Sequence, residues 1–138
     1  MKFRTAFLPI ALVNLSVILW AAEVRKIAPK EAAQLVADGK AVLVDVREAS
    51  EWQESGVALP AVLLPMSDYK GDQKLWKPFL ANNAGKEIIL YCRSGTRSES
   101  VAADLALKGI TAANLGSLKA WTAAGLPTRT VEASSSTK

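Results

Sequence analysis

The chain has 138 residues, half of them hydrophobic, which is enough for one well-buried domain and too short for two ordinary ones. Its net charge of +4 is mild, and no basic stripe interleaved with aromatic residues suggests nucleic-acid binding. The chain contains no histidine and one cysteine. These counts exclude Cys–His and Ser–His catalytic pairs, histidine-based zinc sites and an intramolecular disulfide, so we expect no metal and no cofactor.

Residues 1–22 have the layout of a secretory signal. Lys2 and Arg4 come first, a largely apolar stretch follows, and Ala21 and Ala22 precede the polar sequence EVRK. Without the two early cations, 15 basic residues face 13 acidic ones, a net charge of +2. We therefore expect an exported protein, located in the periplasm.

Cleavage of this segment is a separate question. A cut after either alanine would place the bulky Leu19 or Trp20 three residues upstream, where a small residue is preferred. The alternative is an uncleaved membrane anchor over residues 5–22, since the apolar run approaches the roughly 18–20 residues that span a bilayer. Both alternatives place the domain outside the cytoplasm, where a lone cysteine is more suited to a reactive role than to a structural one.

From Val24 onward, strand-like and helix-like segments alternate, which predicts an α/β fold with a central, mainly parallel sheet flanked by helices. We expect strands at 24–27, 41–46, 61–64, 87–91 and 112–115, and helices at 29–39, 48–56, 74–83, 98–109 and 118–124. The continuous apolar runs of the second and fourth strands are typical of parallel strands buried on both faces. One domain would span residues 23–129, and the small, polar residues 130–138 would form a disordered tail.

Cys92 directly follows the expected strand 87–91 and precedes a helix, the position where open α/β sheets form their binding crevices. The loop between them contains Gly95, which can adopt a positive φ, so its backbone N–H groups can point inward as an anion nest. With Arg93 and Arg97 nearby, such a nest can lower a thiol pKa from about 8.5 to roughly 3.5–7.5 without a histidine base. The CxxGxRS pattern favours this role over a buried, inert cysteine.

Three segments, in order, resemble a single-domain rhodanese of exported type, a thiosulfate sulfurtransferase. VLVDVREASEWQESG at 42–56 resembles the family's D-V-R-E-x-x-E-[WF]-x-x-G segment, YCRSGTRS at 91–98 resembles its active loop, and NLGSLKAWTAAGLP at 114–127 resembles its closing segment. The resemblance runs from about Val24 to Pro127. It implies a parallel sheet flanked by helices, with a loop cysteine that carries a persulfide.

Carried over by position, the resemblance implies that Cys92 is the nucleophile. The residues of the implied substrate-binding loop are Arg93, Ser94, Gly95, Thr96, Arg97 and Ser98. Asp45 and Arg47 would either support the pocket or belong to a structural ion-pair network, in which Arg47 pairs with Glu48 or Glu51. The implied partners are a small anionic sulfur donor and a thiol or cyanide acceptor, and the oligomeric state stays open.

The charge of thiosulfate bears on the two loop arginines. The donor brings two negative charges to a site whose thiolate is already negative, so compensating cations are needed. Arg93 and Arg97 are the only cations inside the loop. We expect Arg97, next to the helix, to face the pocket and Arg93 to lie at its rim.

Four other positions carry expectations about the fold. Trp52 and Trp121 suit the core better than the site. Pro60 stands where the family's His-Ile-Pro-Gly-Ala stretch has its glycine, and Ser117 stands where a second glycine is common. We expect the backbone turns at these two positions to differ from the family's pattern.

Two other functions stay open. Phosphatases of the same fold have five residues between cysteine and arginine, whereas only Arg93 to Thr96 separate Cys92 from Arg97. The shorter ring suits a sulfur atom better than a phosphate, and the loop contains no acidic residue to act as general acid. The other alternative is a rhodanese-like module that docks partners or carries a persulfide without turnover. Inactive modules commonly lack the cysteine, but its presence here does not exclude a carrier.

Overall fold

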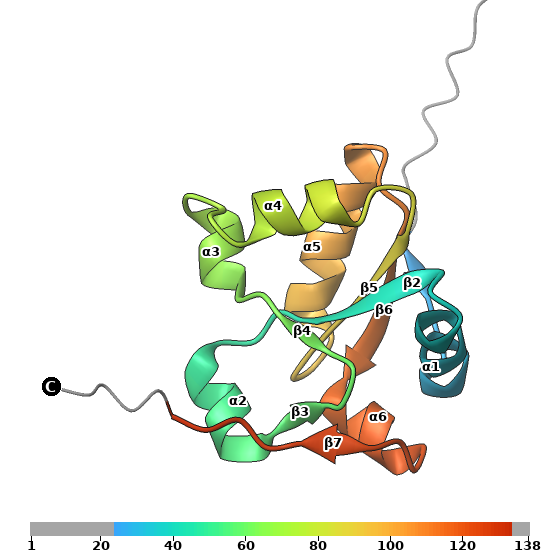
Figure 1. Ribbon diagram of the computed structural model, residues 1–138, viewed down its shortest axis with the longest axis vertical. Coiled ribbons are helices and arrows are strands. Elements are labelled where there is room, and N and C mark those ends of the chain that lie inside the picture. The colour runs from blue at the N-terminus through green and yellow to red at the C-terminus, as the bar shows by residue number, and fades with distance from the viewer. Residues whose placement is uncertain (1–23, 134–138) are drawn as a thin grey trace, which may run out of the picture.

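The computed structural model describes residues 24–133, which form an α/β fold around a central sheet (Figure 1). Within this range, five strands form an entirely parallel sheet in the order β1-β6-β5-β2-β4. They are β1 (Arg25–Lys26), β2 (Ala41–Asp45), β4 (Val62–Leu63), β5 (Glu87–Cys92) and β6 (Ala112–Ser117). The expected parallel sheet flanked by helices is thereby confirmed.

Helices cover both faces of this sheet. They are α1 (Pro29–Ala37), α2 (Ala49–Ser55), α3 (Met66–Lys70), α4 (Trp76–Asn82), α5 (Thr96–Leu107) and α6 (Leu118–Ala123). α3, α4 and α5 pack on one face, and α1 and α6 contribute to the core on the other face (Figure 1). α2 follows the carboxyl end of β2, on the side of the molecule where the loop after β5 also lies.

The predicted signal or anchor over residues 1–22 lies outside the described residues, and so does the end of the predicted tail, 134–138. Between residues 24 and 133, no helix is long and apolar enough to cross a membrane. The same range contains no group of carboxylates and thiols arranged to hold a metal ion.

Three short elements were not expected from the sequence. α3 is one of them, and the others are β3 (Val57–Ala58) and β7 (Thr128–Arg129), which pair antiparallel in a separate two-residue ladder. Gly56 permits this pairing, because it has φ 72° and a Cβ there would lie 2.8 Å from the carbonyl oxygen of Arg129. Two-residue strands carry no periodicity to detect, so only the folded chain reveals their pairing.

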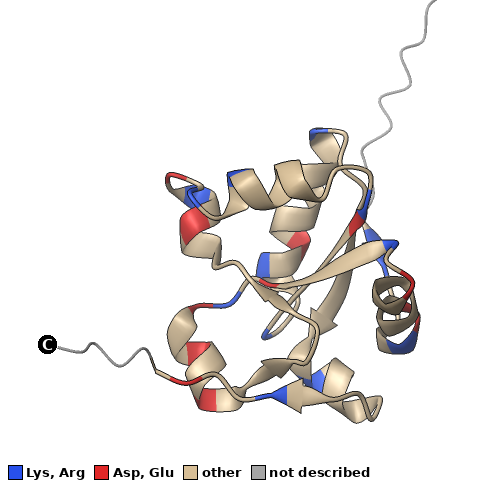
Figure 2. Cartoon of the chain, in the orientation of Figure 1, with Lys and Arg blue, Asp and Glu red and all other residues tan. Residues whose placement is uncertain are grey.

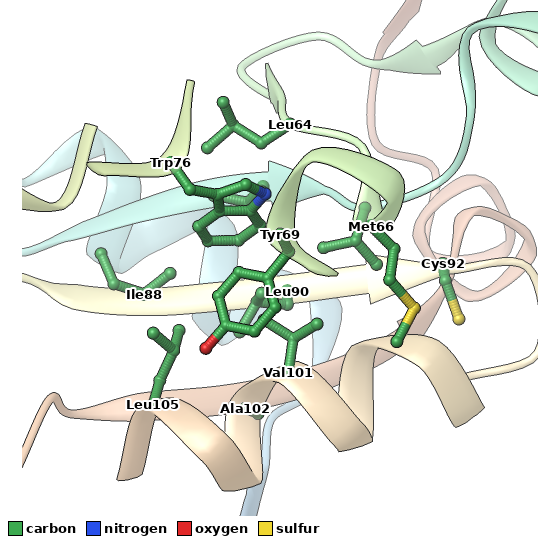
Figure 3. Close-up of a cluster of buried hydrophobic side chains, with 12 residues drawn as sticks. Leu64, Met66, Tyr69, Trp76, Ile88, Leu90, Cys92, Val101, Ala102 and Leu105 are labelled. Atoms are coloured by element: carbon green, nitrogen blue, oxygen red, sulfur yellow. The ribbon is translucent and has the colours of Figure 1, made fainter. Parts of the chain in front are cut away.

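The core has two halves, one on each face of the central sheet, and β5 contributes side chains to both. Side chains alternate along this strand, so that Ile88, Leu90 and Cys92 belong to the half that contains Trp76, and Ile89 and Tyr91 belong to the other. Figure 3 shows Cys92 at the edge of the first half, past Met66. The catalytic candidate thus lies where the apolar core meets the carboxyl end of the sheet.

The two tryptophans expected in the core are buried there, with Trp52 8% exposed and Trp121 1% exposed. Of the two positions that depart from the family's pattern, Pro60 lies in a turn closed by the Ala61 N–H, which donates to the Ala58 carbonyl at 3.0 Å. Ser117 has an extended backbone, and its hydroxyl oxygen accepts from the Ala120 N–H at 3.1 Å. Serine therefore serves there as the N-cap of α6 and needs no glycine conformation.

Candidate active site

Cys92 is the last residue of β5, which lies between β6 and β2 in the sheet. The chain turns at Gly95, whose φ of 93° is the left-handed conformation expected from the sequence, and α5 begins at the next residue. A Cβ at this position would also lie 3.3 Å from the Cα of Gly116. Glycine is thus required both by the backbone conformation and by the close approach of β6.

The thiol of Cys92 is fully buried beneath its own loop. The Gly95 N–H donates to Sγ at 3.1 Å, and the Ser98 hydroxyl oxygen lies 3.5 Å from Sγ. Burial raises the pKa of the thiol, but the Ser98 hydroxyl and the backbone N–H groups of Ser98, Gly95 and Ser94 together bring the pKa below its ordinary value of 9.0. The loop therefore favours the thiolate without histidine, as predicted, but through the Ser98 hydroxyl and backbone N–H groups and not through the expected Arg93 and Arg97.

Arg97 binds Glu51, a residue 46 positions earlier on α2. Both terminal nitrogens of the guanidinium donate to the carboxylate, each at 2.7 Å. The guanidinium lowers the pKa of Glu51 to about 2, and the carboxylate raises the pKa of Arg97. The Glu48 N–H also donates to Glu51, in the capping box of α2. This ion pair joins the start of α5 to the first turn of α2.

Asp45 and Arg47 form a second ion pair at the end of β2. Arg47 Nη2 donates to Asp45 Oδ2 at 2.7 Å, and Nε donates to both carboxylate oxygens at 3.0 and 3.1 Å. Asp45 is fully buried and Arg47 is 4% exposed. The expected partners Glu48 and Glu51 were therefore wrong, because Asp45 is two residues away and buried with Arg47.

Arg47 also donates hydrogen bonds to the C-terminal end of α2. Nη1 donates to the Ser55 hydroxyl at 2.6 Å, and Nη2 donates to the Gly56 carbonyl at 2.7 Å. The guanidinium also lies 5.9 Å from the centre of the Tyr91 ring, on β5. Arg47 thus connects β2, α2 and β5 and has a structural task whatever its relation to a substrate.

A cavity of about 500 Å³ lies between α2 and α6, and Arg93 reaches it from the loop. It is lined by Arg47, Glu51, Glu54, Ser55, Arg93, Leu118, Lys119 and Thr122. Acidic residues come from α2 and a basic residue from α6 (Figure 2). Arg93 and Lys119 provide the cations here without an ion-pair partner among residues 24–133.

A second cavity, of about 590 Å³, lies on the other side of the loop. Its lining includes Ser94, Gly95 and Thr96 from the loop and Asn114 from β6. The residues expected to form one substrate-binding loop are thus divided. Cys92 and Ser98 are buried, and Ser94 to Thr96 face the second cavity. Arg97 was expected to face the pocket and Arg93 to lie at its rim, but Arg93 lines the first cavity whereas Arg97 binds Glu51 and lines neither cavity.

Sequence reasoning missed two residues that contact this loop. The sequence predicts Glu51 only as a partner of Arg47, although its spacing from Glu48 is that of a capping box. Asn114 belongs to the expected strand 112–115 and has no predicted role there. A polar residue within an apolar strand next to an active loop is itself a signal, because buried polar groups need partners. Asn114 is 8% exposed and bonds to Gly95, Ser98 and Glu99.

Comparison with known proteins identifies this arrangement. The profile of the Rhodanese-like domain matches residues 28–124, which include the loop and both ion pairs. The chain belongs to the rhodanese family. A relative of this rhodanese-like chain in Synechocystis sp., the uncharacterized protein slr1261, is 38% identical over 104 residues. That match covers 74% of this chain and 54% of the relative, so the rhodanese-like chain spans about half the length of the curated relative that it matches.

Solved structures agree on the rhodanese fold. The human single-domain sulfurtransferase TSTD1 has a TM-score of 0.56 at 22% identity, over 73% of this chain and 97% of TSTD1. A Rhodopseudomonas palustris protein of unknown function, described as a possible tyrosine phosphatase, has a TM-score of 0.63 at 22% identity, over 77% of this chain and 85% of that protein. At these identities the likeness establishes the fold alone.

Proposed function

We propose that this rhodanese-like protein transfers sulfane sulfur from thiosulfate, or a similar anionic donor, to a thiol or cyanide acceptor through a persulfide on Cys92. The observation that carries the proposal is the environment of Sγ. A buried thiol meets the Gly95 N–H at 3.1 Å and the Ser98 hydroxyl at 3.5 Å, and its pKa is lowered despite burial. A thiolate stabilised in this way is a good nucleophile toward sulfur.

The proposed reaction has two steps. In the first, the Cys92 thiolate attacks the outer sulfur of thiosulfate, so that an Sγ–S bond forms, the S–S bond of the donor breaks, and sulfite leaves with the electron pair. In the second, the acceptor attacks the outer sulfur of the persulfide, and the electron pair of the broken bond returns to Sγ. The thiolate is thereby regenerated, where the same N–H and O–H donors stabilise it.

The cations supply the attraction for the donor. Arg93 and Lys119 line the 500 Å³ cavity beside the loop, and Arg97 adds a half-exposed guanidinium held by Glu51. These charges oppose the repulsion between a dianionic donor and the thiolate. Asp45 and Arg47 then act indirectly, by fixing the helix that carries Glu51.

The test uses the purified full chain, thiosulfate and cyanide. Thiocyanate should form, mass spectrometry should detect one added sulfur after thiosulfate alone, and a folded Cys92→Ala variant should do neither. Ser100→Ala, an exposed serine on the same helix as Ser98, is the matched control and should keep both properties. A folded wild-type protein that forms neither persulfide nor thiocyanate would falsify the proposal.

Two results would select the alternatives instead. A stable persulfide that no small acceptor removes would favour a carrier of persulfide or a partner-docking module. Rapid release of phosphate from an aryl phosphate ester, dependent on Cys92, would favour a phosphatase. The four residues between Cys92 and Arg97 argue against the latter, because the phosphatases use five.

We also propose that the protein is exported to the periplasm, on the composition of residues 1–22. Fractionation of cells that produce the full chain tests the location. The mass of the recovered protein distinguishes a cleaved signal from a membrane anchor over residues 5–22. Recovery of the full-length chain in the cytosol would contradict both.

A further inference from the structure

Asn114 lies beneath the active loop because β6 is irregular at this point. Leu90 of β5 is opposite Asn114, but the next residue, Tyr91, is opposite Gly116, so the register shifts by one residue of β6. Such a bulge changes the direction of the side chains around it and is common beside active sites. The amide of Asn114 reaches the loop from this position, and the residue is 8% exposed.

The orientation of the Asn114 amide is fixed by its partners. Nδ2 donates to the Gly95 carbonyl at 3.1 Å and to the Glu99 carboxylate at 2.8 Å. Oδ1 accepts from the Gly116 N–H at 3.0 Å. A flipped amide would place an oxygen against two acceptors and an NH₂ group against a donor, so only the described orientation satisfies every partner.

This orientation determines what the Ser98 hydroxyl does. Its oxygen lies 2.7 Å from Asn114 Oδ1, 3.1 Å from the Gly95 carbonyl oxygen and 3.5 Å from Cys92 Sγ. The first two are acceptors, and so is the thiolate, whereas the hydroxyl has one proton. The contact with Oδ1 is the shortest and holds the Ser98 oxygen in place beside Sγ. When Sγ is charged it becomes the strongest acceptor of the three, while Oδ1 still accepts from the Gly116 N–H and the carbonyl still accepts from Asn114 Nδ2.

We propose that Asn114 is a positioning residue for Cys92, acting through Gly95 and Ser98. These two residues supply the N–H at 3.1 Å and the hydroxyl at 3.5 Å from Sγ, and Asn114 is hydrogen-bonded to both of them from the neighbouring strand. It therefore acts on the thiol through the positions of these two donors, without touching the sulfur. Its importance for turnover rests on the proposed sulfur transfer, whereas its effect on the thiol does not.

The first measurement is the thiol pKa of the full chain, followed by ultraviolet thiolate absorbance with Cys92→Ala as the blank. Cys92 is the only cysteine, so the signal has one source. Asn114→Ala should raise the thiol pKa by about one unit, because hydrogen bonds to a charged group are among the stronger ones in proteins. Asn83→Ala is the matched control. Its Nδ2 donates to the Phe79 carbonyl at 2.8 Å on α4, and its loss should leave the thiol pKa unchanged.

A double substitution separates positioning from general damage. Ser98→Ala alone should also raise the thiol pKa, and the Ser98→Ala, Asn114→Ala pair should raise it by less than the sum of the two, because Asn114 acts partly through Ser98. If Asn114→Ala does not fold, Asn114→Thr keeps a residue that suits a strand while removing both N–H donors, and its shift should have the same sign.

The second measurement is the pH profile of sulfur transfer. Asn114→Ala should lower the rate at neutral pH about tenfold, and the rate should recover at higher pH as the thiolate forms again. A merely distorted site would not recover. A thiol pKa that stays the same or falls, or fully additive shifts in the double variant, would overturn the proposal. A raised thiol pKa in a protein without sulfur transfer would leave it intact and reject only the proposed function.

Discussion

Two arginine–carboxylate pairs brace the same helix, α2, from its two ends, and they differ in exposure. Arg47 and Asp45, at the carboxyl end of β2, are 4% and 0% exposed in their side chains. Arg97 and Glu51, at the first turn of α2, are 32% and 23% exposed. The same chemical pairing therefore occurs once inside the protein and once at its surface.

The use of the guanidinium donors separates the two pairs further. A guanidinium has five N–H groups. Arg47 directs Nε and both terminal nitrogens to protein acceptors on β2 and α2. Arg97 uses one N–H of each terminal nitrogen for Glu51, and its Nε has no partner among residues 24–133. Arg47 is therefore committed to the fold, whereas Arg97 is held in place with donors still available to an anion.

The comparison shows that a resemblance in sequence does not by itself assign an arginine to substrate or to structure. Burial raises the cost of leaving a charge unpaired. We therefore expect the buried Arg47–Asp45 pair, the inner pair, to control stability. A partly exposed pair contributes little to stability but can orient a cation. We therefore expect the Arg97–Glu51 pair, the outer pair, to control substrate binding. Four substitutions test this division, from the largest expected effect to the smallest.

Asp45→Asn should have the largest effect, on stability. It leaves the buried Arg47 without its charged partner, which typically costs about 3–5 kcal/mol of the free energy of unfolding. Urea denaturation followed by tryptophan fluorescence measures this loss. Asp72→Asn is the matched control, because Asp72 pairs with Lys74 at 3.7 Å with both side chains about 80% exposed. Equal losses for the two variants would mean that burial does not make the Arg47–Asp45 pair more important for stability than an exposed pair.

Arg97→Ala should raise the KM for thiosulfate by about tenfold to a hundredfold while changing stability little. A charge-assisted contact in a partly dry site contributes about 1.5–3 kcal/mol, whereas an exposed pair contributes about 1 kcal/mol or less. Thiosulfate kinetics over a range of ionic strengths give both the KM and its salt dependence. A wild-type KM and salt dependence would mean that backbone amides alone bind the donor.

Glu51→Gln should raise the KM by about threefold, because Arg97 remains but is no longer oriented. It should also alter acid unfolding. Since the folded-state pKa of Glu51 is lowered from 4.5 to about 2, its ionised form stabilises the wild type above pH 4.5, and this contribution is lost as the pH falls toward 2. The variant should lack that part of the pH dependence.

The control for this experiment is Glu54→Gln, on the same helix and the same cavity but without an ion-pair partner in the described chain. It should unfold in acid as the wild type does. If Glu51→Gln also keeps the wild-type acid transition, ionised Glu51 makes no pH-dependent contribution to stability. The role assigned to the outer pair would then be wrong.

Arg93→Ala should have the smallest effect. Arg93 is exposed, lines the 500 Å³ cavity and has no ion-pair partner among residues 24–133, so its loss removes charge from the rim without freeing another group. We expect the KM for thiosulfate to rise about twofold to threefold, more at low than at high salt, and unchanged urea unfolding. An effect larger than that of Arg97→Ala would reverse the assignment of the two loop arginines.

The sequence alone was sufficient to predict those parts of the site that depend only on residues adjacent in the chain. A buried apolar run, a single cysteine, a glycine and a helix follow one another within residues 87–109, and each element is specified by its own neighbours. The position of Cys92 at the end of a buried strand, the positive φ of Gly95 and the lowered thiol pKa could therefore be predicted. So could the parallel sheet, because long alternation of strands and helices leaves few other architectures.

Only the tertiary structure decided what surrounds that loop. Glu51 and Arg97 are 46 residues apart, and Asn114 reaches Gly95 across 19 residues through a register shift in β6. The pairing of β3 with β7 and the division of the loop between two cavities arise in the same way. Side-chain partners at such separations depend on how strands and helices pack, and packing is a property of the whole chain that local periodicity does not encode.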